Sequence, residues 1–493
     1  MQLVAYGAQD IYLTGNPQIT FFKVVYRRHT NFSMEAIQQT IQGTPSQGGR
    51  STVTISRNGD LIQKIYLCSP DTSGEPGGIT NGSGLLNEVE LEIGGQTIDK
   101  QTAEWMQIWN ELSTPFSKAS ALKYMQGDIG TNGGNLASTQ EYAGVSKIQV
   151  PLLFWFCRNP GLALPLIALQ YHEVKLRCKW GSGDNGIGAE KAEIWVDYIY
   201  LDTDERRRFA QVSHEYLIEQ IQIQGASGNK TTKLKFNHPV KELIWTNQSD
   251  HDYGTAQLKL NGHDRFAKQT YEYFQLRQPY DYHTAVPNYN IKFTQDSPST
   301  GSLTFGPSVA PGGTPVKEGI SVDADDGGAG VILLDFYQPH FFDNTNKIRI
   351  TNLSNLASEE ATIDTINYNK DNEHITLTLT DVLSTLVDST AGHFYFIETL
   401  NSQFRANFIS RTSNLRKKIN VYSFALKPEE HQPSGTCNFS RIDTAQLEFT
   451  NIIGGGGTNC VVSEFPDTES NIYAVNYNVL RIMSGMGGLA YSN

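Results

Sequence analysis

Short alternating apolar segments that end in Gly or Asn turns are the feature that most constrains the fold of this chain. Residues 89–93 alternate apolar and acidic side chains before a Gly-Gly pair, and residues 256–260 alternate in the same way before an Asn-Gly pair. Alternation places one face of a strand in a core and the other in water. Many such strands separated by turns predict an all-β protein built of sandwiches or barrels.

One segment departs from the strand pattern. In residues 103–112, Trp105, Ile108, Trp109 and Leu112 recur at the spacing of one helical face. The segment predicts an amphipathic helix that covers one end of a sandwich. A cofactor groove is disfavoured because no convergent polar group accompanies the apolar stripe.

The order of motifs suggests a duplicated β domain. The chain has 493 residues, which suits about three domains or two large β domains. "VELEIGGQ" (89–96) is echoed by "AQLKLNGH" (256–263). "PLLFWFCRNPG" followed by "LQYHEVKL" is likewise echoed by "VYSFALKPEEHQPSG" followed by "IDTAQLEF". Similar units in the same order favour two related halves.

Two further segments organise the chain. Residues 202–210, "DTDERRRFA", place acids before bases, as the dipole of a short connecting helix favours. Asp202 and Asp204 make a poor catalytic pair because the adjacent arginines hold both ionised. Residues 282–418 are rich in Ser, Thr, Gly and Asp yet contain strand-like runs such as "HITLTLT". We therefore predict a β-rich insertion with a small core of its own in a loop of the second half.

Composition excludes several classes of protein. Lys and Arg number 39 and Asp and Glu 51, so the formal charge is −12, which disfavours wrapping nucleic acid over the whole surface. The five cysteines include no CxxC motif and are interpreted as mostly reduced thiols in a cytosolic setting. The sequence offers neither a signal peptide nor a run of 18 apolar residues.

Common catalytic and ligand-binding motifs are absent from the sequence. The sequence holds no HExxH, GxSxG, GxxxxGK[ST] or GxGxxG pattern. His172 and Glu173 are neighbours in a strand-like run and point to opposite faces, so we expect His172 to be solvated or hydrogen-bonded. "DADDGGAG" (323–330) lacks the register of a Ca²⁺ loop, and "GGGG" (454–457) has no helix behind it to hold phosphate. We therefore predict no enzyme, no metal site and no cofactor, and a structural or binding protein.

The segment "GNPQITFFKVVYRRHTNF" (15–32) combines apolar, aromatic and basic side chains near the start of the chain. Such segments usually lie free in solvent when they are terminal. Two interpretations stay open. The segment is either the first strand of a core with solvated bases or an arm that another surface covers.

Blocks along the chain resemble the major capsid proteins of large icosahedral double-stranded DNA viruses, in particular algal viruses and their giant-virus relatives. The blocks occur in order and are "QLVAYGAQDIYLTGNPQITFFKVVYRRHTNF" (2–32), "ISRNGDLI" (55–62), "LEIGGQTIDK" (91–100), "NPGLALPLIALQYHEVKL" (159–176), "WVDYIYLDTDERRRFAQVSHEYLIEQ" (195–220), "FNHPVKELIW" (236–245), "LNGHDRFA" (260–267), "YSFALKPEEHQPSGTCNFSRID" (422–443) and "NYNVLRIMSGMGGLAYSN" (476–493). Residues 101–150 and 282–418 match poorly.

The resemblance implies two consecutive eight-stranded antiparallel jelly rolls. It implies an N-terminal arm over residues 1–25, a first jelly roll over 26–212 and a second over 213–493, which the 282–418 insertion interrupts. It also implies a homotrimer that serves as a pseudo-hexagonal capsomer of the outer icosahedral capsid of a virion, assembled in the host-cell cytoplasm. Neighbouring capsomers, minor capsid and penton proteins and an internal lipid layer are the implied partners, without direct contact to nucleic acid.

Within this framework we expect the arm to lead into the first strand around residues 21–32. Phe21 or Phe22 would be buried within the subunit or under a neighbour, and Lys23, Arg27 and Arg28 would meet acidic partners. The insertion would face outward. Two alternative functions are a minor capsid paralogue and a carbohydrate-binding β-sandwich protein, since a fold does not by itself fix a function.

Overall fold

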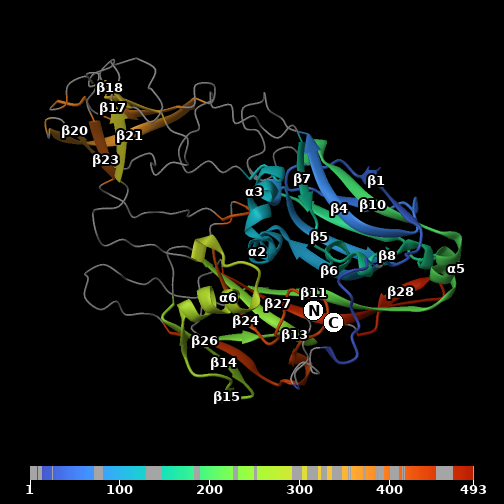
Figure 1. The fold of residues 1–493 in the computed structure, drawn as a ribbon. Helices are drawn as coiled ribbons and strands as arrows, with labels where there is room; N and C mark the ends of the chain where they lie inside the picture. Colours follow the sequence, from blue (N-terminus) through green and yellow to red (C-terminus); the bar gives the residue numbers. More distant parts are fainter. Residues whose placement is uncertain are drawn as a thin grey trace.

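The computed structural model confirms an all-β architecture and shows two sandwiches and a separate sheet (Figure 1). It describes residues 8, 14–24, 26–70, 82–128, 147–182, 189–225, 231–248, 253–290, 302–307, 320–323, 330–335, 347–352, 355, 357–369, 374–380, 382–384, 386, 394–399, 410–413, 415, 417–450 and 470–491. The "DADDGGAG" segment between 324 and 329, the "GGGG" run and Cys460 lie outside these described residues.

The first sandwich consists of two antiparallel sheets. One sheet has the order β1-β10-β4-β7 with β8 paired to β4, and the other has the order β2-β3-β9-β5-β6. The strands are β1 (Phe32–Gln39), β2 (Ile41–Gln42), β3 (Arg50–Thr54), β4 (Leu61–Pro70), β5 (Leu86–Ile93), β6 (Gln96–Thr102), β7 (Lys147–Pro151), β8 (Leu164–Pro165), β9 (Val174–Trp180) and β10 (Glu193–Leu201).

The second sandwich repeats the strand order of the first. Its sheets run β11-β27-β13-β24 and β12-β26-β14-β15, with β25, β28 and β16 paired at the margins. The strands are β11 (His214–Gly225), β12 (Thr231–Leu234), β13 (Pro239–Gln248), β14 (Thr255–Leu260), β15 (His263–Asp264), β16 (Gln269–Thr270), β24 (Lys417–Ser423), β25 (Cys437–Asn438), β26 (Ala445–Thr450), β27 (Asn471–Met483) and β28 (Met486–Leu489).

Taken in chain order, eight strands of one sandwich match eight of the other. The pairs are β1 with β11, β3 with β12, β4 with β13, β5 with β14, β6 with β15, β7 with β24, β9 with β26 and β10 with β27. Each sandwich is therefore an eight-stranded jelly roll, as predicted. The sequence echoes fall on the equivalent hairpins β5–β6 and β14–β15 and on the equivalent connections from β7 to β9 and from β24 to β26.

Both echoed hairpins turn through two residues with left-handed backbone. Gly94 and Gly95 have φ of 59° and 87°, and Asn261 and Gly262 have φ of 52° and 79°. Two consecutive positive φ values match the twist of the flanking strands, and Gly and Asn adopt them at low cost. The turn residues thus set the register of each hairpin.

Helical segments are short and lie mainly in the connections. The helices are α2 (Ala103–Ser113), α3 (Phe116–Met125), α4 (Trp155–Arg158), α5 (Thr203–Gln211) and α6 (Gln278–Tyr282), with single turns η1 (Gly82–Gly84), η2 (Pro160–Leu162), η3 (Leu166–Ala168), η5 (Ala189–Lys191), η6 (Tyr273–Arg277), η7 (Asn288–Asn290) and η9 (Phe439–Arg441). The predicted connector helix is α5, whose first backbone N–H, that of Thr203, donates to the Asp202 carboxylate.

Helix α2 forms where predicted, but it covers a different surface. Thr102, the last residue of β6, accepts a hydrogen bond from the Trp105 backbone N–H and caps the helix. The apolar stripe is buried in one cluster with residues of the second sandwich, among them Ile244, Val421 and Tyr473. The helix therefore packs on a sheet face of the other sandwich and does not cap one end of its own, because that face presents the matching apolar surface.

The insertion contains a seven-stranded sheet with its own core. The strands are β17 (Ser302–Pro307), β18 (Ile320–Asp323), β19 (Val331–Asp335), β20 (Lys347–Asn352), β21 (Ser358–Asn369), β22 (His374–Leu379) and β23 (Phe394–Thr399), in the order β17-β23-β20-β21-β22-β19-β18. The described residues of its apolar cluster, including Ile350, Ile363 and Leu377, all belong to the insertion. The predicted small independent core is present.

The first strand begins later than expected. The described residues from Gly15 to Asn31 form no strand, and β1 starts at Phe32. The interpretation of residues 15–32 as the first core strand is therefore wrong. Since only the last residue of this segment enters a sheet, the side chains before it do not share the core of the sandwich.

Substitution at the β5–β6 turn tests the importance of close packing there. A Cβ atom at Gly94 would collide with the His172 ring, whereas one at Gly95 would meet open space. Both positions have positive φ, so Gly95→Ala is the matched control for backbone strain. We expect Gly95→Ala to cost about 1 kcal/mol and Gly94→Ala about 2–3 kcal/mol in the free energy of unfolding. Equal losses in thermal or denaturant unfolding would contradict the collision.

Candidate assembly surfaces

The predicted arm residues lie in solvent in the isolated chain. Phe21 and Phe22 are 90% and 98% exposed, so burial of either within the subunit is wrong. Lys23, Arg27 and Arg28 are exposed as well. The structure thus brings these residues together along one segment without packing them on a sandwich.

Further apolar side chains extend this exposed surface. Ile19, Val24 and Tyr26 are exposed beside the two phenylalanines, and Phe32 and Met34 of β1 continue the series. Exposed apolar patches on soluble proteins mark interaction sites when they are contiguous. The segment from Ile19 to Met34 is accordingly the principal candidate for a contact with another molecule.

The second functional feature is the junction between the two sandwiches, because it fixes their relative orientation. Trp105 and Trp109 of α2 pack in a cluster with Ile221, Ile244 and Val475 on the outer face of the β11-β27-β13-β24 sheet. The ring centroids of Trp105 and Tyr473 lie 5.3 Å apart. Aromatic burial of this kind contributes both apolar area and a defined geometry.

A buried ionic cluster lies beside this apolar contact. The Glu219 carboxylate is 2.7 Å from the Arg158 Nη1 atom and 2.7 Å from the Lys241 Nζ atom. The Arg158 guanidinium stacks 4.7 Å from the Trp109 ring centroid, and Tyr477 lies 5.5 Å from Lys241 Nζ. Burial alone would raise the pKa of Glu219, but the two cations hold the pKa below its ordinary value. Arg158 belongs to the first sandwich and the other two to the second, so this cluster connects them.

Glu111 of α2 anchors both ends of the insertion. Its fully buried carboxylate accepts hydrogen bonds from the backbone N–H groups of Asn288 (3.3 Å), Arg411 (3.0 Å) and Thr412 (3.1 Å). Asn288 precedes the seven-stranded sheet and Arg411 follows it. A single carboxylate therefore holds the points where the chain leaves and re-enters the second sandwich.

His283 holds the start of the insertion in a buried ionic site. Its Nε2 atom lies 3.0 Å from Glu242, and its Nδ1 atom lies 3.0 Å from Glu429. Burial alone would lower the pKa of His283, but the two carboxylates raise it to about 9. The imidazolium is thus the charge that lets two acidic side chains approach each other in the interior.

The last hairpin of the second sandwich docks on the first sandwich. His172 Nδ1 lies 2.9 Å from the Gly487 carbonyl oxygen, and the Tyr171 N–H donates to the Gly485 carbonyl. The expectation of a hydrogen-bonded His172 is confirmed. Because β28 follows β27 through a two-residue turn, this contact ties the end of the second sandwich to the first.

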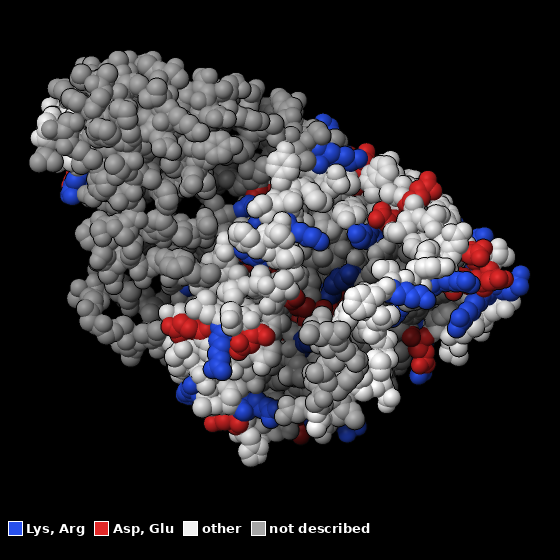
Figure 2. Space-filling model, viewed as in Figure 1, with Lys and Arg blue, Asp and Glu red and all other residues white. Residues whose placement is uncertain are grey.

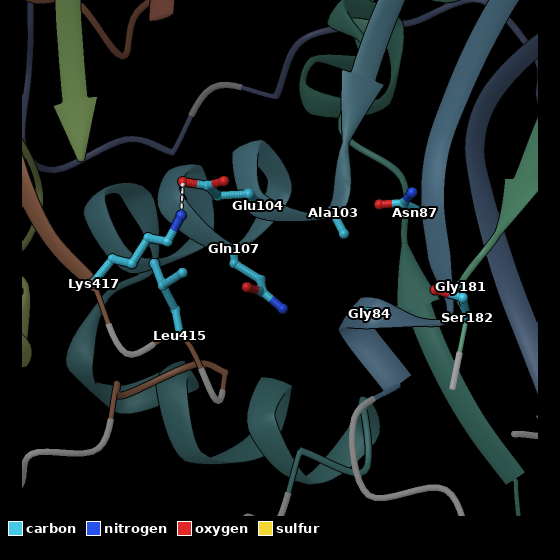
Figure 3. Close-up of a pocket in the computed structure, with 9 residues that line it drawn as sticks. All are labelled: Gly84, Asn87, Ala103, Glu104, Gln107, Gly181, Ser182, Leu415 and Lys417. Atoms are coloured by element: carbon cyan, nitrogen blue, oxygen red, sulfur yellow. Dashed lines mark hydrogen bonds and ion pairs between the residues drawn. The ribbon is translucent and has the colours of Figure 1, made fainter. Parts of the chain in front are cut away.

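A small cleft opens where the two sandwiches and α2 meet (Figure 3). Its volume is about 280 Å³, and its walls come from the first sandwich, α2 and the start of β24. The Glu104 carboxylate lies 3.2 Å from Lys417 Nζ and also accepts from Thr246 and Asn471. The residues that line the cleft include no His and no Cys. The cleft therefore has no Ser–His or Cys–His pair of the kind that nucleophilic catalysis uses.

Three further features concern metal binding, thiol chemistry and membrane spanning in the described part of the chain. His, Cys, Asp and Glu side chains at described positions form no group of three arranged around a metal position. Burial raises the pKa of Cys157 and Cys178 to about 12, so both thiols stay protonated. None of the helices among the described residues has the length and hydropathy to span a bilayer. Figure 2 shows acidic and basic side chains intermixed on the viewed face, with both kinds gathered at the tip where α5 lies.

Two protein-family profiles match the chain, one over each sandwich. The profile of the family described as "Major capsid protein N-terminus" matches residues 20–202, and that of "Large eukaryotic DNA virus major capsid protein" matches residues 205–294 and 406–488. The second profile passes over residues 295–405, which contain the seven-stranded sheet.

The similar proteins share the full length of the chain. A major capsid protein of Pyramimonas orientalis virus is 44% identical and one of Paramecium bursaria Chlorella virus 1 is 37% identical, each covering 100% of this chain and 99% of the relative. Among solved structures, PBCV-1 VP54 fitted into a reconstruction of the virophage Sputnik matches with a TM-score of 0.59 and 31% identity, covering 96% of this chain and 100% of the other.

The buried His283 site generates a prediction about pH. The pKa of His283 is raised from 6.5 to about 9 in the folded chain, so its stabilising contribution is complete below pH ~6.5 and is lost as the pH rises towards ~9. We expect His283→Gln to lower the free energy of unfolding by at most about 3 kcal/mol near pH 6. The difference from the unsubstituted chain should shrink towards pH ~9.5.

Thermal unfolding followed by circular dichroism across this pH range measures the effect. His263→Gln in β15, an exposed position, provides the control and should follow the unsubstituted chain. A stability difference for His283→Gln that stays constant with pH would show that the His283 charge does not stabilise the fold.

Proposed function

The chain belongs to the large eukaryotic DNA virus major capsid protein family, and on this basis we propose that three copies assemble into a pseudo-hexagonal capsomer of the outer icosahedral shell. The observation that carries the proposal is the repeated strand order of the two sandwiches. Three chains with two similar sandwiches each supply six similar walls. A three-fold closed ring of such chains has a six-sided outline and tiles a flat facet.

The division of the chain follows the same proposal. Residues 1–25 are an arm, 26–212 the first jelly roll and 213–493 the second, with the insertion at 282–418. The strands of the two sandwiches run from Phe32 to Leu201 and from His214 to Leu489. The family profile matches the chain on both sides of residues 295–405 but not within them. We expect the insertion to project from the outer surface of the shell, because it is anchored at both ends on one side of the second sandwich.

The proposed role is geometric and not catalytic. The junction residues fix the angle between the sandwiches, and capsomer contacts then act together through multivalency. The shell forms in the host-cell cytoplasm, which agrees with the free thiols of Cys68, Cys157, Cys178 and Cys437. The net charge of −12 favours protein and lipid neighbours over direct contact with nucleic acid.

The oligomeric state tests this proposal directly. We expect the purified chain to have the mass of three copies in native mass spectrometry and light scattering, with a six-sided outline in negative-stain images. A monomer at micromolar concentration would overturn the capsomer assignment. A minor capsid paralogue would form the same trimer, and its low abundance in purified virions would identify it.

The exposed arm is proposed to contact minor capsid or penton proteins or the internal lipid layer. Phe21 and Phe22 supply apolar contacts, and Lys23, Arg27 and Arg28 supply charge for acidic partners. The support is that this apolar segment is uncovered in the single chain.

Arm variants separate assembly of the trimer from assembly of the shell. We expect the double variant Phe21→Ser, Phe22→Ser to form trimers normally but to enter shells at least tenfold less well in cells that also produce the other shell proteins. Phe116→Ser, at a residue of α3 that is 85% exposed, is the matched control and should enter normally. Normal shells from the double variant would overturn the role of Phe21 and Phe22 in the arm.

A further inference from the structure

The junction inside the chain shows how one sandwich of this protein recognises another. The outer face of the β11-β27-β13-β24 sheet is covered by elements of the first sandwich. These elements are α2, which lies between β6 and β7, and the loop after β7, whose Leu153 packs against the same cluster. Helix and loop thus form one apolar surface that fits this sheet.

The equivalent sheet of the first sandwich also carries apolar side chains on its outer face, beside the paired Lys64 and Asp197. Ile37 and Val196 point into the core, and alternation places Phe32 and Met34 of β1 and Trp195 of β10 on the opposite side. Tyr66 of β4 pairs with Trp195 and shares that side. The Tyr66–Trp195 pair has its counterpart in the covered sheet, where Ile244 and Tyr473 are paired in the same way.

This face is not covered by the second sandwich of the same chain. Figure 1 shows the β1-β10-β4 sheet on the side of the first sandwich that is turned away from the second. Phe209 of α5 covers Leu201 and Ile199 at one end. Phe32 and Met34 stay 52% and 49% exposed, whereas Ile244 and Tyr473 on the covered sheet are buried.

The second sandwich in turn carries an unused copy of the covering surface. Its helical segment between β16 and β24, formed by η6 and α6, exposes Leu276 and Tyr280. The loop after β24, which is equivalent to the loop after β7, exposes Leu426, at 74%. The exposed apolar side chains therefore lie on the elements that are equivalent to the contact inside the chain.

We propose that the contact between chains is a copy of the junction within the chain. Leu276, Tyr280 and Leu426 of one copy pack on the outer β1-β10-β4-β7 face of a second copy, around Phe32, Met34 and Trp195. This inference rests on the proposed trimer and names its contact surfaces. Because each copy offers one surface and receives the other, the contact is heterologous and closes into a ring. Six sandwiches, hence three chains, complete the ring when every junction turns the chain by one sixth of a full turn.

Two single variants test the two surfaces. We expect Met34→Glu, on the receiving sheet, and Tyr280→Glu, on the covering segment, each to reduce the mass from three chains to one in native mass spectrometry, because a charge would be buried at every contact. Met34→Leu and Tyr280→Phe keep the apolar surface and should stay trimeric. Phe116→Glu, on α3 and outside both surfaces, should stay trimeric as well.

Mixing the two charged variants tests whether the contact is heterologous. The Met34→Glu chain keeps a working covering segment, and the Tyr280→Glu chain keeps a working sheet. An equimolar mixture should therefore yield a heterodimer in native mass spectrometry. Neither variant alone should give a dimer, and the mixture should give no trimer. Absence of the heterodimer would show that the two surfaces do not bind each other.

The outcomes distinguish this inference from the proposed function. A monomeric unsubstituted chain would refute the trimer itself. A trimeric unsubstituted chain whose charged variants also remain trimeric would refute only the surfaces named here. Circular dichroism spectra and melting temperatures show whether each variant is folded. Leu426→Glu is a second variant of the covering surface, and Phe32→Glu is a second variant of the receiving sheet. We expect the same change of mass from both.

Discussion

The burial of the α2 stripe on the second sandwich is the contact on which the rest of the structure depends. Two jelly rolls joined by the short helix α5 would otherwise be free to change their angle. Trp105 and Trp109 remove that freedom because they pack on an apolar face of the other sandwich. The Arg158–Glu219–Lys241 cluster makes the relative orientation of the two sandwiches more specific, since a buried charge tolerates few arrangements. The proposed capsomer, whose walls have to meet at fixed angles, needs a junction of this kind.

Helix α2 also fixes the points where the insertion joins the second sandwich. Glu111 holds the backbone at Asn288 and Arg411, and His283 lies between two carboxylates close by. The seven-stranded sheet buries its own apolar cluster. Because its ends are fixed and its core is independent, the insertion changes the surface of the molecule without changing the junction between the sandwiches.

Much of the fold could be predicted from local patterns. Period-two alternation identified strands such as β5 and β14, the Gly-Gly and Asn-Gly pairs identified their turns, and the spacing of Trp105, Ile108, Trp109 and Leu112 identified α2. The order of these motifs indicated the duplication that the sheet topology now shows. These signals are local because side-chain periodicity follows directly from backbone geometry.

The sequence by itself determined the elements, their order and the family resemblance, whereas the tertiary structure decided what each apolar or charged surface meets. Periodicity marked the α2 stripe but not the sheet it covers. No sequence pattern around His283 indicated its contacts with Glu242 and Glu429, which lie 41 and 146 residues away in the chain. Phe21 and Phe22 were recognised as apolar, yet only the folded chain left them uncovered. Such partners are set by long-range packing, which depends on the joint arrangement of all the strands and cannot be read from neighbouring residues.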